Sequence, residues 1–167
     1  MSTQTRTLAT MHLWAGVPGV RLEDTYATDI DDLWEAVTDP ERLARWVAHV
    51  TGDLRPGGRF EIRFTSGAEG PGRIEACEPP HRLFVTMMPG EDDATTLEAT
   101  LAEVDGGTRL VVEERGLPRE MLPAYGGGWQ VHLEDLHAYL EGRPTADWGA
   151  RANELKPTYQ TMSVEES

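Results

Sequence analysis

The feature that most constrains the fold is a series of alternating segments joined by links too short for a crossover. In residues 59–64, apolar and charged side chains alternate with a period of two, the pattern of a strand with one buried face. The same reasoning predicts four further strands, and Asp-Gly-Gly at residues 105–107 indicates a tight hairpin between the last two. Because a parallel crossover needs about a dozen residues or more, neighbouring strands here must be antiparallel. The expected strands are residues 59–64, 73–78, 82–88, 95–104 and 108–115.

Two short helices are predicted ahead of this meander. Asp29 can cap the first helix, and acidic side chains follow it in the first turn, where the helix dipole favours negative charge. Asp39 can cap the second, and Pro40 suits its first position because the missing N–H has no partner there. Before the helices, a strand ending near Trp14 and a returning strand over residues 20–26 predict a hairpin.

A long helix is predicted near the C-terminus. Apolar residues recur at spacings of three and four from Trp129 to Leu140, and Gly142 follows where a helix would end. Three consecutive glycines at 126–128 disfavour helix, so this helix is expected to begin at Trp129. A weaker helical pattern covers residues 147–159.

Length and element order predict an α+β chain with one domain. The 167 residues suit a single domain over residues 1–162, with residues 163–167 as a frayed tail. The single cysteine, Cys77, excludes an internal disulfide, and its strand-like surroundings favour a small core residue over a reactive thiol.

Charge and hydropathy exclude several classes of partner. With 15 Lys and Arg against 29 Asp and Glu, the net charge of −14 disfavours a phosphate backbone or an anionic membrane surface. No apolar run approaches the roughly 20 residues that span a bilayer, and residues 1–6 lack the apolar stretch of a secretion signal. We therefore expect a cytoplasmic protein that binds no nucleic acid and does not insert into membranes.

Five segments, in order and with characteristic spacing, carry a resemblance to a known family. The sequence resembles bacterial proteins similar to the activator of the heat-shock-protein-90 ATPase, within the SRPBCC, START and birch-allergen-like superfamily. The resemblance covers residues 8–159 and implies a helix-grip fold, in which a curved antiparallel sheet wraps around the long C-terminal helix. It also implies an elongated cavity for apolar molecules, but no single activity. The segments are Leu33–Trp46, Gly52–Phe60, Glu75–Leu83, Gly106–Leu110 and Gly127–Leu133.

The wall of such a cavity is predicted from the apolar face of the sheet and the stripe on the long helix. Aromatic side chains would offer contact area to a flat ligand, and methionine adapts its shape readily. The alternative is that the same residues fill a packed core. The candidates are Trp46, Phe60, Phe64, Val85, Met87, Leu97, Trp129, His132, Leu133 and Leu136.

His132 is the titratable group best placed for chemistry. On the apolar stripe it could orient a ligand carbonyl or act as a general base, although a histidine at the edge of the core, bonded to backbone or water, is the alternative. His137 follows five residues later, a separation that does not suit a pair of metal ligands. No metal site and no cofactor are expected.

Two carboxylates could face the interior of the sheet. Asp24 and Glu98 each lie in a predicted strand, and a buried acid there would need a partner. Arg63, Arg73 or Arg109 could supply one.

Three functions fit these features. The first is binding of a small hydrophobic molecule, lipid, sterol-like or polyketide-like, by a carrier or sensor. The second is a protein-interaction module or chaperone regulator, and the third is a cyclase- or hydrolase-like enzyme using His132. A large internal cavity would favour the first and third, an exposed apolar patch the second, and polar groups converging on the cavity the third over the first. The chain is expected to be a monomer or a homodimer.

Overall fold

The computed structural model describes residues 6–167 and contains one nine-stranded sheet with four α-helices. The first five residues of the expected domain lie outside this described range. The strands are β1 (Ala9–Trp14), β2 (Val17–Tyr26), β3 (Ala48–Gly52), β4 (Arg59–Phe64), β5 (Glu69–Glu78), β6 (Arg82–Met87), β7 (Thr95–Val104), β8 (Gly107–Arg115) and β9 (Val164–Glu166). The helices are α1 (Ile30–Thr38), α2 (Pro40–Leu43), a 3-10 turn η1 (Arg119–Met121), α3 (Leu122–Leu140) and α4 (Trp148–Gln160).

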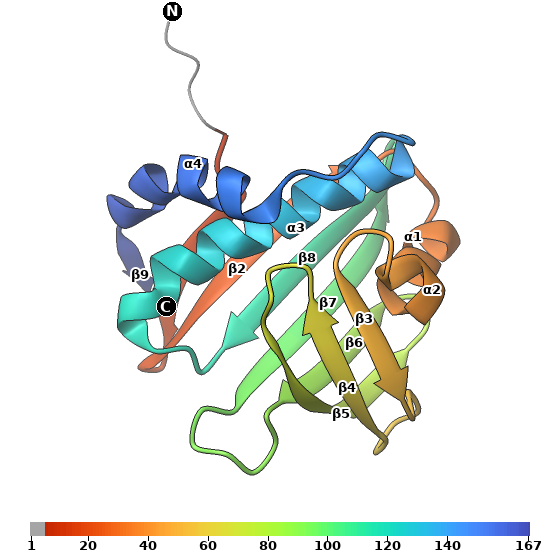
Figure 1. Cartoon of the computed structure of the whole chain (residues 1–167), viewed down its shortest axis with the longest axis horizontal. Coiled ribbons are helices and arrows are strands. Elements are labelled where there is room, and N and C mark those ends of the chain that lie inside the picture. The colour runs from red at the N-terminus through yellow and green to blue at the C-terminus, as the bar shows by residue number, and fades with distance from the viewer. Residues whose placement is uncertain (1–5) are drawn as a thin grey trace, which may run out of the picture.

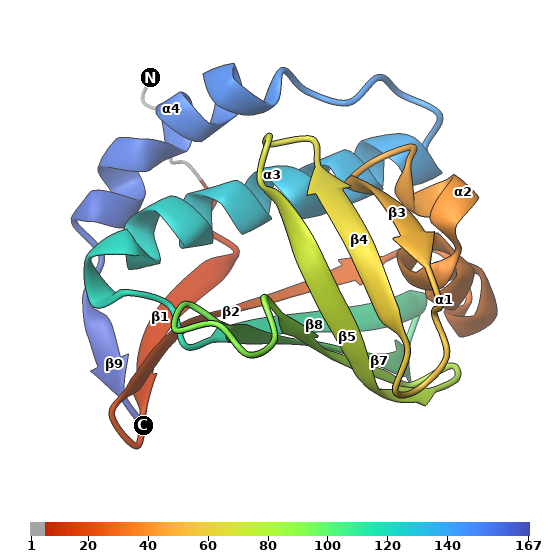
Figure 2. The same cartoon turned by 60° about the horizontal axis from the view of Figure 1, so that its bottom comes forward.

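The sheet is open and strongly curved, and α3 lies across its concave face (Figures 1 and 2). Its strand order is β3-β4-β5-β6-β7-β8-β2-β1-β9. Every neighbouring pair is antiparallel except β1 and β9, which are parallel. This arrangement is the helix-grip fold, and α1 and α2 close one end of it (Figure 1).

The meander predicted from the alternating segments is confirmed. Strands β4 and β7 have the expected bounds, whereas β5 begins four residues earlier than expected, at Glu69. Within β4, Phe60 is buried while the charged residues that alternate with it are exposed. Strand β3, which pairs with β4 at the edge of the sheet, was not predicted.

The predicted starts of the two short helices are also confirmed. The Asp29 side chain accepts a hydrogen bond from the backbone N–H of Asp32, which satisfies one free donor at the start of α1. Asp39 occupies the N-cap of α2 and Pro40 its first position, although the Asp39 side chain makes no capping bond there.

The expected start of the long helix at Trp129 is wrong, because α3 begins at Leu122 and contains the three glycines. The reason is a packing contact with α4. The Cβ position built on Gly126 lies 3.3 Å from the Tyr159 ring and that on Gly128 lies 3.0 Å from the Trp148 ring, so the missing side chains at these two positions let α4 approach the α3 backbone. This close packing outweighs the low helix propensity of glycine.

Of the C-terminal residues 163–167, expected to be frayed, Val164–Glu166 form β9 instead. The backbone N–H of Ser167 donates to the Leu13 carbonyl at 3.0 Å, and Met11 lies opposite Val164 in the register. The free edge of β1 therefore gains a partner, and the sheet becomes mixed rather than purely antiparallel.

The core between the sheet and α3 is made largely of fully buried aliphatic and tyrosine side chains. Leu22, Leu110 and Leu133 are among them, and the Tyr26 hydroxyl donates to the Leu133 carbonyl at 3.0 Å. This bond ties β2 to the middle of α3. No helix within residues 6–167 has the length and apolar character to cross a membrane.

Candidate functional site

Two adjoining hollows lie between the concave face of the sheet and α3. The inner hollow has a volume of about 150 Å³ and is bordered by strands β3 to β8, the α1–α2 region and α3. Its lining is apolar apart from Thr38 and Cys77. The Thr38 hydroxyl already donates to the Trp34 carbonyl at 2.6 Å, and the Trp46 indole N–H donates to the Ala36 carbonyl at 2.9 Å. The inner hollow therefore presents almost only hydrocarbon surface.

The outer hollow is larger, about 590 Å³, and more polar. It is bordered by the turn between β4 and β5, the adjacent ends of β6, β7 and β8, the N-terminal half of α3, and Trp148 at the start of α4. Glu114, Tyr125 and His132 are among its lining residues. This hollow brings ionisable groups together beside aromatic rings.

Four side chains line both hollows and form the partition between them. The Phe64 and Trp129 rings meet edge to face, with centroids 6.0 Å apart, and Met87 and Leu97 complete the set. An apolar group moving from the outer to the inner hollow would pass these side chains.

Glu114 is a buried acid at the partition. Its side chain is on the inner face of β8, and the residue is 7% exposed. One carboxyl oxygen accepts from the Thr95 hydroxyl and the other from the Trp129 indole N–H, both at 2.8 Å. Burial raises the pKa of Glu114, against the opposing effect of these two hydrogen bonds. The acid is thus shifted toward its uncharged form.

The alternation in the last meander strand is a sequence signal for Glu114. Thr108, Leu110, Val112 and Glu114 alternate along the last meander strand, and all four are buried in the structure. Extending the apolar alternation by two residues would have placed Glu114 on the inner face.

His132 projects into an aromatic environment on the same border. It is 4% exposed, and its ring centroid lies 5.4 Å from that of Trp129 and 5.8 Å from that of Phe64. Burial lowers the pKa of His132 to about 4, so its imidazole is uncharged at neutral pH. Within residues 6–167, Nδ1 of His132 and Nε1 of Trp148 are both buried and have no hydrogen-bond partner.

The structure places all but one of the predicted wall residues around these hollows. Leu136 is the exception, because it is fully buried in the core and lines neither hollow. Whether the others contact a ligand remains a prediction. The inner hollow is lined by Trp46, Phe60, Val85 and Leu133, the outer hollow by His132, and both hollows by Phe64, Met87, Leu97 and Trp129.

Asp24 faces the interior as expected, but none of the three expected arginines pairs with it. Its carboxylate contacts His137 Nε2 at 2.8 Å and the Arg6 guanidinium at 3.0 Å. Burial would raise the pKa of Asp24, but the His137 bond and the Thr25 backbone N–H outweigh it and lower the pKa. This group joins β2, α3 and the N-terminal segment, away from both hollows.

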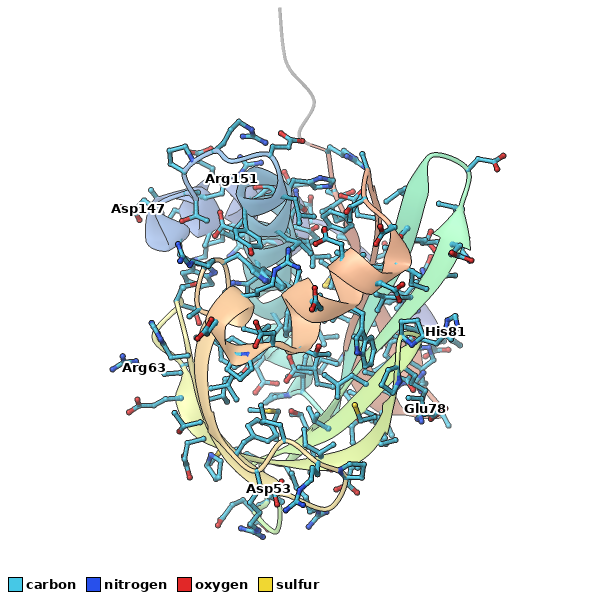
Figure 3. All side chains as sticks on the ribbon, turned by 90° about the vertical axis from the view of Figure 1, so that its right-hand side faces the viewer. Asp53, Arg63, Glu78, His81, Asp147 and Arg151 are labelled. Atoms are coloured by element: carbon cyan, nitrogen blue, oxygen red, sulfur yellow. The ribbon has the colours of Figure 1, made fainter. Side chains whose placement is uncertain are left out.

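The expectation that Glu98 could face inward is wrong. Glu98 alternates with Leu97 on β7, so it lies on the outer face, where it pairs with Arg82 at 2.6 Å. Arg63 likewise points outward from β4 (Figure 3) and cannot reach an interior acid. No group of three or more His, Cys, Asp or Glu side chains within residues 6–167 is arranged to hold a metal ion.

Comparison with known proteins gives one family and several similar structures. The family described as activator of Hsp90 ATPase homolog 1-like protein matches residues 27–141. The crystal structure of CalU16 from Micromonospora echinospora is 26% identical, with a TM-score of 0.76 over 96% of this chain and 98% of that one. No curated protein matches the chain significantly.

Two further structures are similar over about three quarters of the chain. DynU16, a protein in the dynemicin biosynthetic locus, is 28% identical, with a TM-score of 0.70 over 77% of this chain and 50% of that one. MLL2253 from Mesorhizobium loti is 27% identical, with a TM-score of 0.65 over 74% of this chain and 96% of that one.

Proposed function

Because the chain belongs to the family of activator of Hsp90 ATPase homolog 1-like proteins, whose fold is generally a ligand-binding one, we propose that it binds a small hydrophobic molecule between the sheet and α3. The ligand class is lipid, sterol-like or polyketide-like, and the protein acts as a carrier or sensor. The observation that carries this proposal is the apolar lining of the inner hollow beside a larger outer one. Removing apolar ligand surface from water provides the driving force.

The protein-interaction alternative has less support. Among the described residues, the large hydrophobic side chains that are exposed are Val17, Met121 and Tyr125. Two of these, Met121 and Tyr125, border the outer hollow rather than forming a separate patch. An extended apolar surface for a protein partner is therefore not part of the described chain.

An enzymatic role has one specific observation in its favour. Glu114 and His132 both line the outer hollow, and burial shifts the pKa of each, a combination that is enriched in active sites. A carboxyl group with a raised pKa and a neutral imidazole could donate and accept a proton around one bound carbonyl. Native mass spectrometry of protein purified from its host would identify what is bound. DynU16 belongs to a biosynthetic locus, so biosynthetic intermediates are candidates to compare with the recovered mass.

The binding proposal is tested by titrating the protein with the uncharged fluorescent probe N-phenyl-1-naphthylamine. Val85 lines the inner hollow and is 5% exposed, so Val85→Trp should fill the hollow and weaken probe binding roughly tenfold or more. Val17→Trp is the matched control, because Val17 is 44% exposed and lines neither hollow. Equal affinity in the two variants would contradict binding in this cavity.

A further inference from the structure

The two hollows differ in charge and in hydrogen-bonding capacity. The outer hollow is bordered by three acidic residues, Glu69, Asp93 and Glu114. Among the described residues, no Lys or Arg lines either hollow. An anionic ligand group would therefore meet like charge and find no cationic partner.

Two side chains that line the outer hollow each carry a polar atom without a partner among the described residues. His132 Nδ1 and Trp148 Nε1 are buried and unpaired within residues 6–167, and their rings lie side by side with centroids 6.1 Å apart. The indole N–H can only donate, whereas the neutral imidazole nitrogen donates or accepts according to its tautomer. Both nitrogens have almost no accessible surface, so the His132 or Trp148 ring must turn toward the hollow before a ligand oxygen can accept from the indole N–H or bond to the imidazole nitrogen. Native structures rarely leave such buried groups unpaired, so these two atoms point to a ligand group.

We propose that the outer hollow is a head-group site for an uncharged hydroxyl or keto oxygen on an apolar ring system, and that it rejects carboxylates, sulfates and phosphates. The ring system passes the Phe64–Trp129 partition into the inner hollow. This inference rests on the proposed function and adds the chemical class of the ligand.

The electrostatics of the site support this selectivity. Burial raises the pKa of Glu114 and lowers that of His132, so the surroundings disfavour charge on groups of either sign. A ligand carboxylate would meet the same desolvation penalty. Burial likewise disfavours a ligand cation beside His132, whose own imidazole is kept uncharged there. Glu114 is a positioning residue that holds the Trp129 indole at the partition.

Four naphthalene probes test the head-group site, with affinities measured at pH 7 by fluorescence titration. They are naphthalene, 2-naphthol, 2-naphthoate and 2-naphthylmethylammonium, which share one ring system and differ in head group. One hydrogen bond gained should make 2-naphthol bind roughly threefold to tenfold more tightly than naphthalene. Both 2-naphthoate and the ammonium probe should bind more weakly than naphthalene.

Binding of the same probes to His132→Phe tests whether His132 bonds the ligand hydroxyl. This variant keeps a ring at the position but removes both nitrogens. This variant should bind 2-naphthol and naphthalene with affinities equal to within about twofold. Trp148→Phe, which removes the indole N–H, is a second variant with the same expected outcome. His49→Phe is the control, because His49 is exposed and lines neither hollow, and it should keep the preference for 2-naphthol.

The outcomes separate the two proposals. If 2-naphthoate or the ammonium probe binds as tightly as 2-naphthol, or if 2-naphthol keeps its advantage in both ring variants, the head-group site is wrong while ligand binding stands. If none of the four probes binds, the proposed function fails and the head-group site with it.

Discussion

At the scale of single residues, His132 and Glu114 occupy surroundings that would suit apolar side chains better. Each is more than nine-tenths buried, and burial shifts the pKa of each toward the uncharged form. Leucine or phenylalanine at either position would avoid the desolvation of a polar group. Both residues border the outer hollow, so their contribution is expected in binding rather than in stability.

Replacing His132 should change how stability depends on pH. Its pKa is about 4 in the folded protein against an ordinary value of 6.5, so between these values the unfolded chain takes up a proton that the folded chain does not. The stability present above pH 6.5 is therefore lost as the pH falls toward 4. Between pH 7 and pH 5 the wild type should lose about 2 kcal/mol more than His132→Phe.

Urea unfolding at the two pH values measures this difference. His49→Phe, at an exposed position, should follow the wild type, and His132→Phe should be at least as stable as the wild type at pH 7. An equal loss in His132→Phe and the wild type would mean that His132 is solvated and titrates normally.

At the scale of elements, the glycines of α3 set how closely α4 can approach. The Gly127 Cβ position lies 3.5 Å from the Tyr159 ring, an ordinary contact distance, whereas that of Gly128 lies 3.0 Å from the Trp148 ring. Gly127→Ala should therefore gain helix propensity and stabilise the protein by about 0.5–1 kcal/mol. Gly128→Ala gains the same propensity but displaces the indole, and should be about 1 kcal/mol or more less stable than Gly127→Ala.

Thermal and urea unfolding of the two alanine variants provides the comparison. Tryptophan indole N–H signals in NMR spectra should move in Gly128→Ala and stay in place in Gly127→Ala. If the two variants were equally stable, the contact between Trp148 and α3 would not constrain the packing of these helices.

These contacts explain which elements could be predicted from the sequence. Alternation and capping residues act locally, so the strands of the meander and the starts of α1 and α2 could be found by pattern. The start of α3 depends on contact with Tyr159, about thirty residues later in the sequence, which no local pattern reveals. Strands β3 and β9 are short edge strands fixed mainly by their partners, β4 and β1.

The candidate site was only partly predictable for a similar reason. The apolar wall follows from periodicity, but the division into two hollows depends on how Phe64 and Trp129 meet across the cavity. The pairing of Glu114 with Trp129 joins β8 to α3 and likewise needs the tertiary structure.

At the scale of the whole molecule, α4 and the N-terminal strand are tied to α3 by one buried hydroxyl. The Tyr159 hydroxyl accepts from the backbone N–H groups of Leu8 and Ala9, at 3.2 and 3.0 Å, and donates to the Gln130 side chain. Arg151 of α4 adds an ion pair to Glu134 of α3 at 2.8 Å (Figure 3 shows Arg151 on α4). These contacts brace α3 against α4 and the N-terminal strand, so ligand access is expected through the outer hollow.

The single cysteine provides a reporter for that route. Cys77 lines the inner hollow and is half-buried, and burial raises the pKa of its thiol, so alkylation should be slow. If reagents reach the thiol through the outer hollow, Phe64→Ala should open the partition and speed alkylation by iodoacetamide. Phe84→Ala is the matched control, because Phe84 lies on the outer face of β6 beneath Arg82 and should leave the rate unchanged.

A bound ligand should close the same route. At a concentration of N-phenyl-1-naphthylamine about ten times its Kd, about one molecule in ten is free, so alkylation of wild-type Cys77 should slow roughly tenfold. In urea the protein is unfolded and has no hollow, so the rate of Cys77 alkylation should be the same with and without the probe. This control excludes a direct reaction between the probe and iodoacetamide. A probe that binds by fluorescence but gives no protection would be bound outside the inner hollow. If the probe protects the wild type but not Val85→Trp, the apolar part of the ligand lies beside Cys77, in the hollow that is lined almost only by hydrocarbon surface.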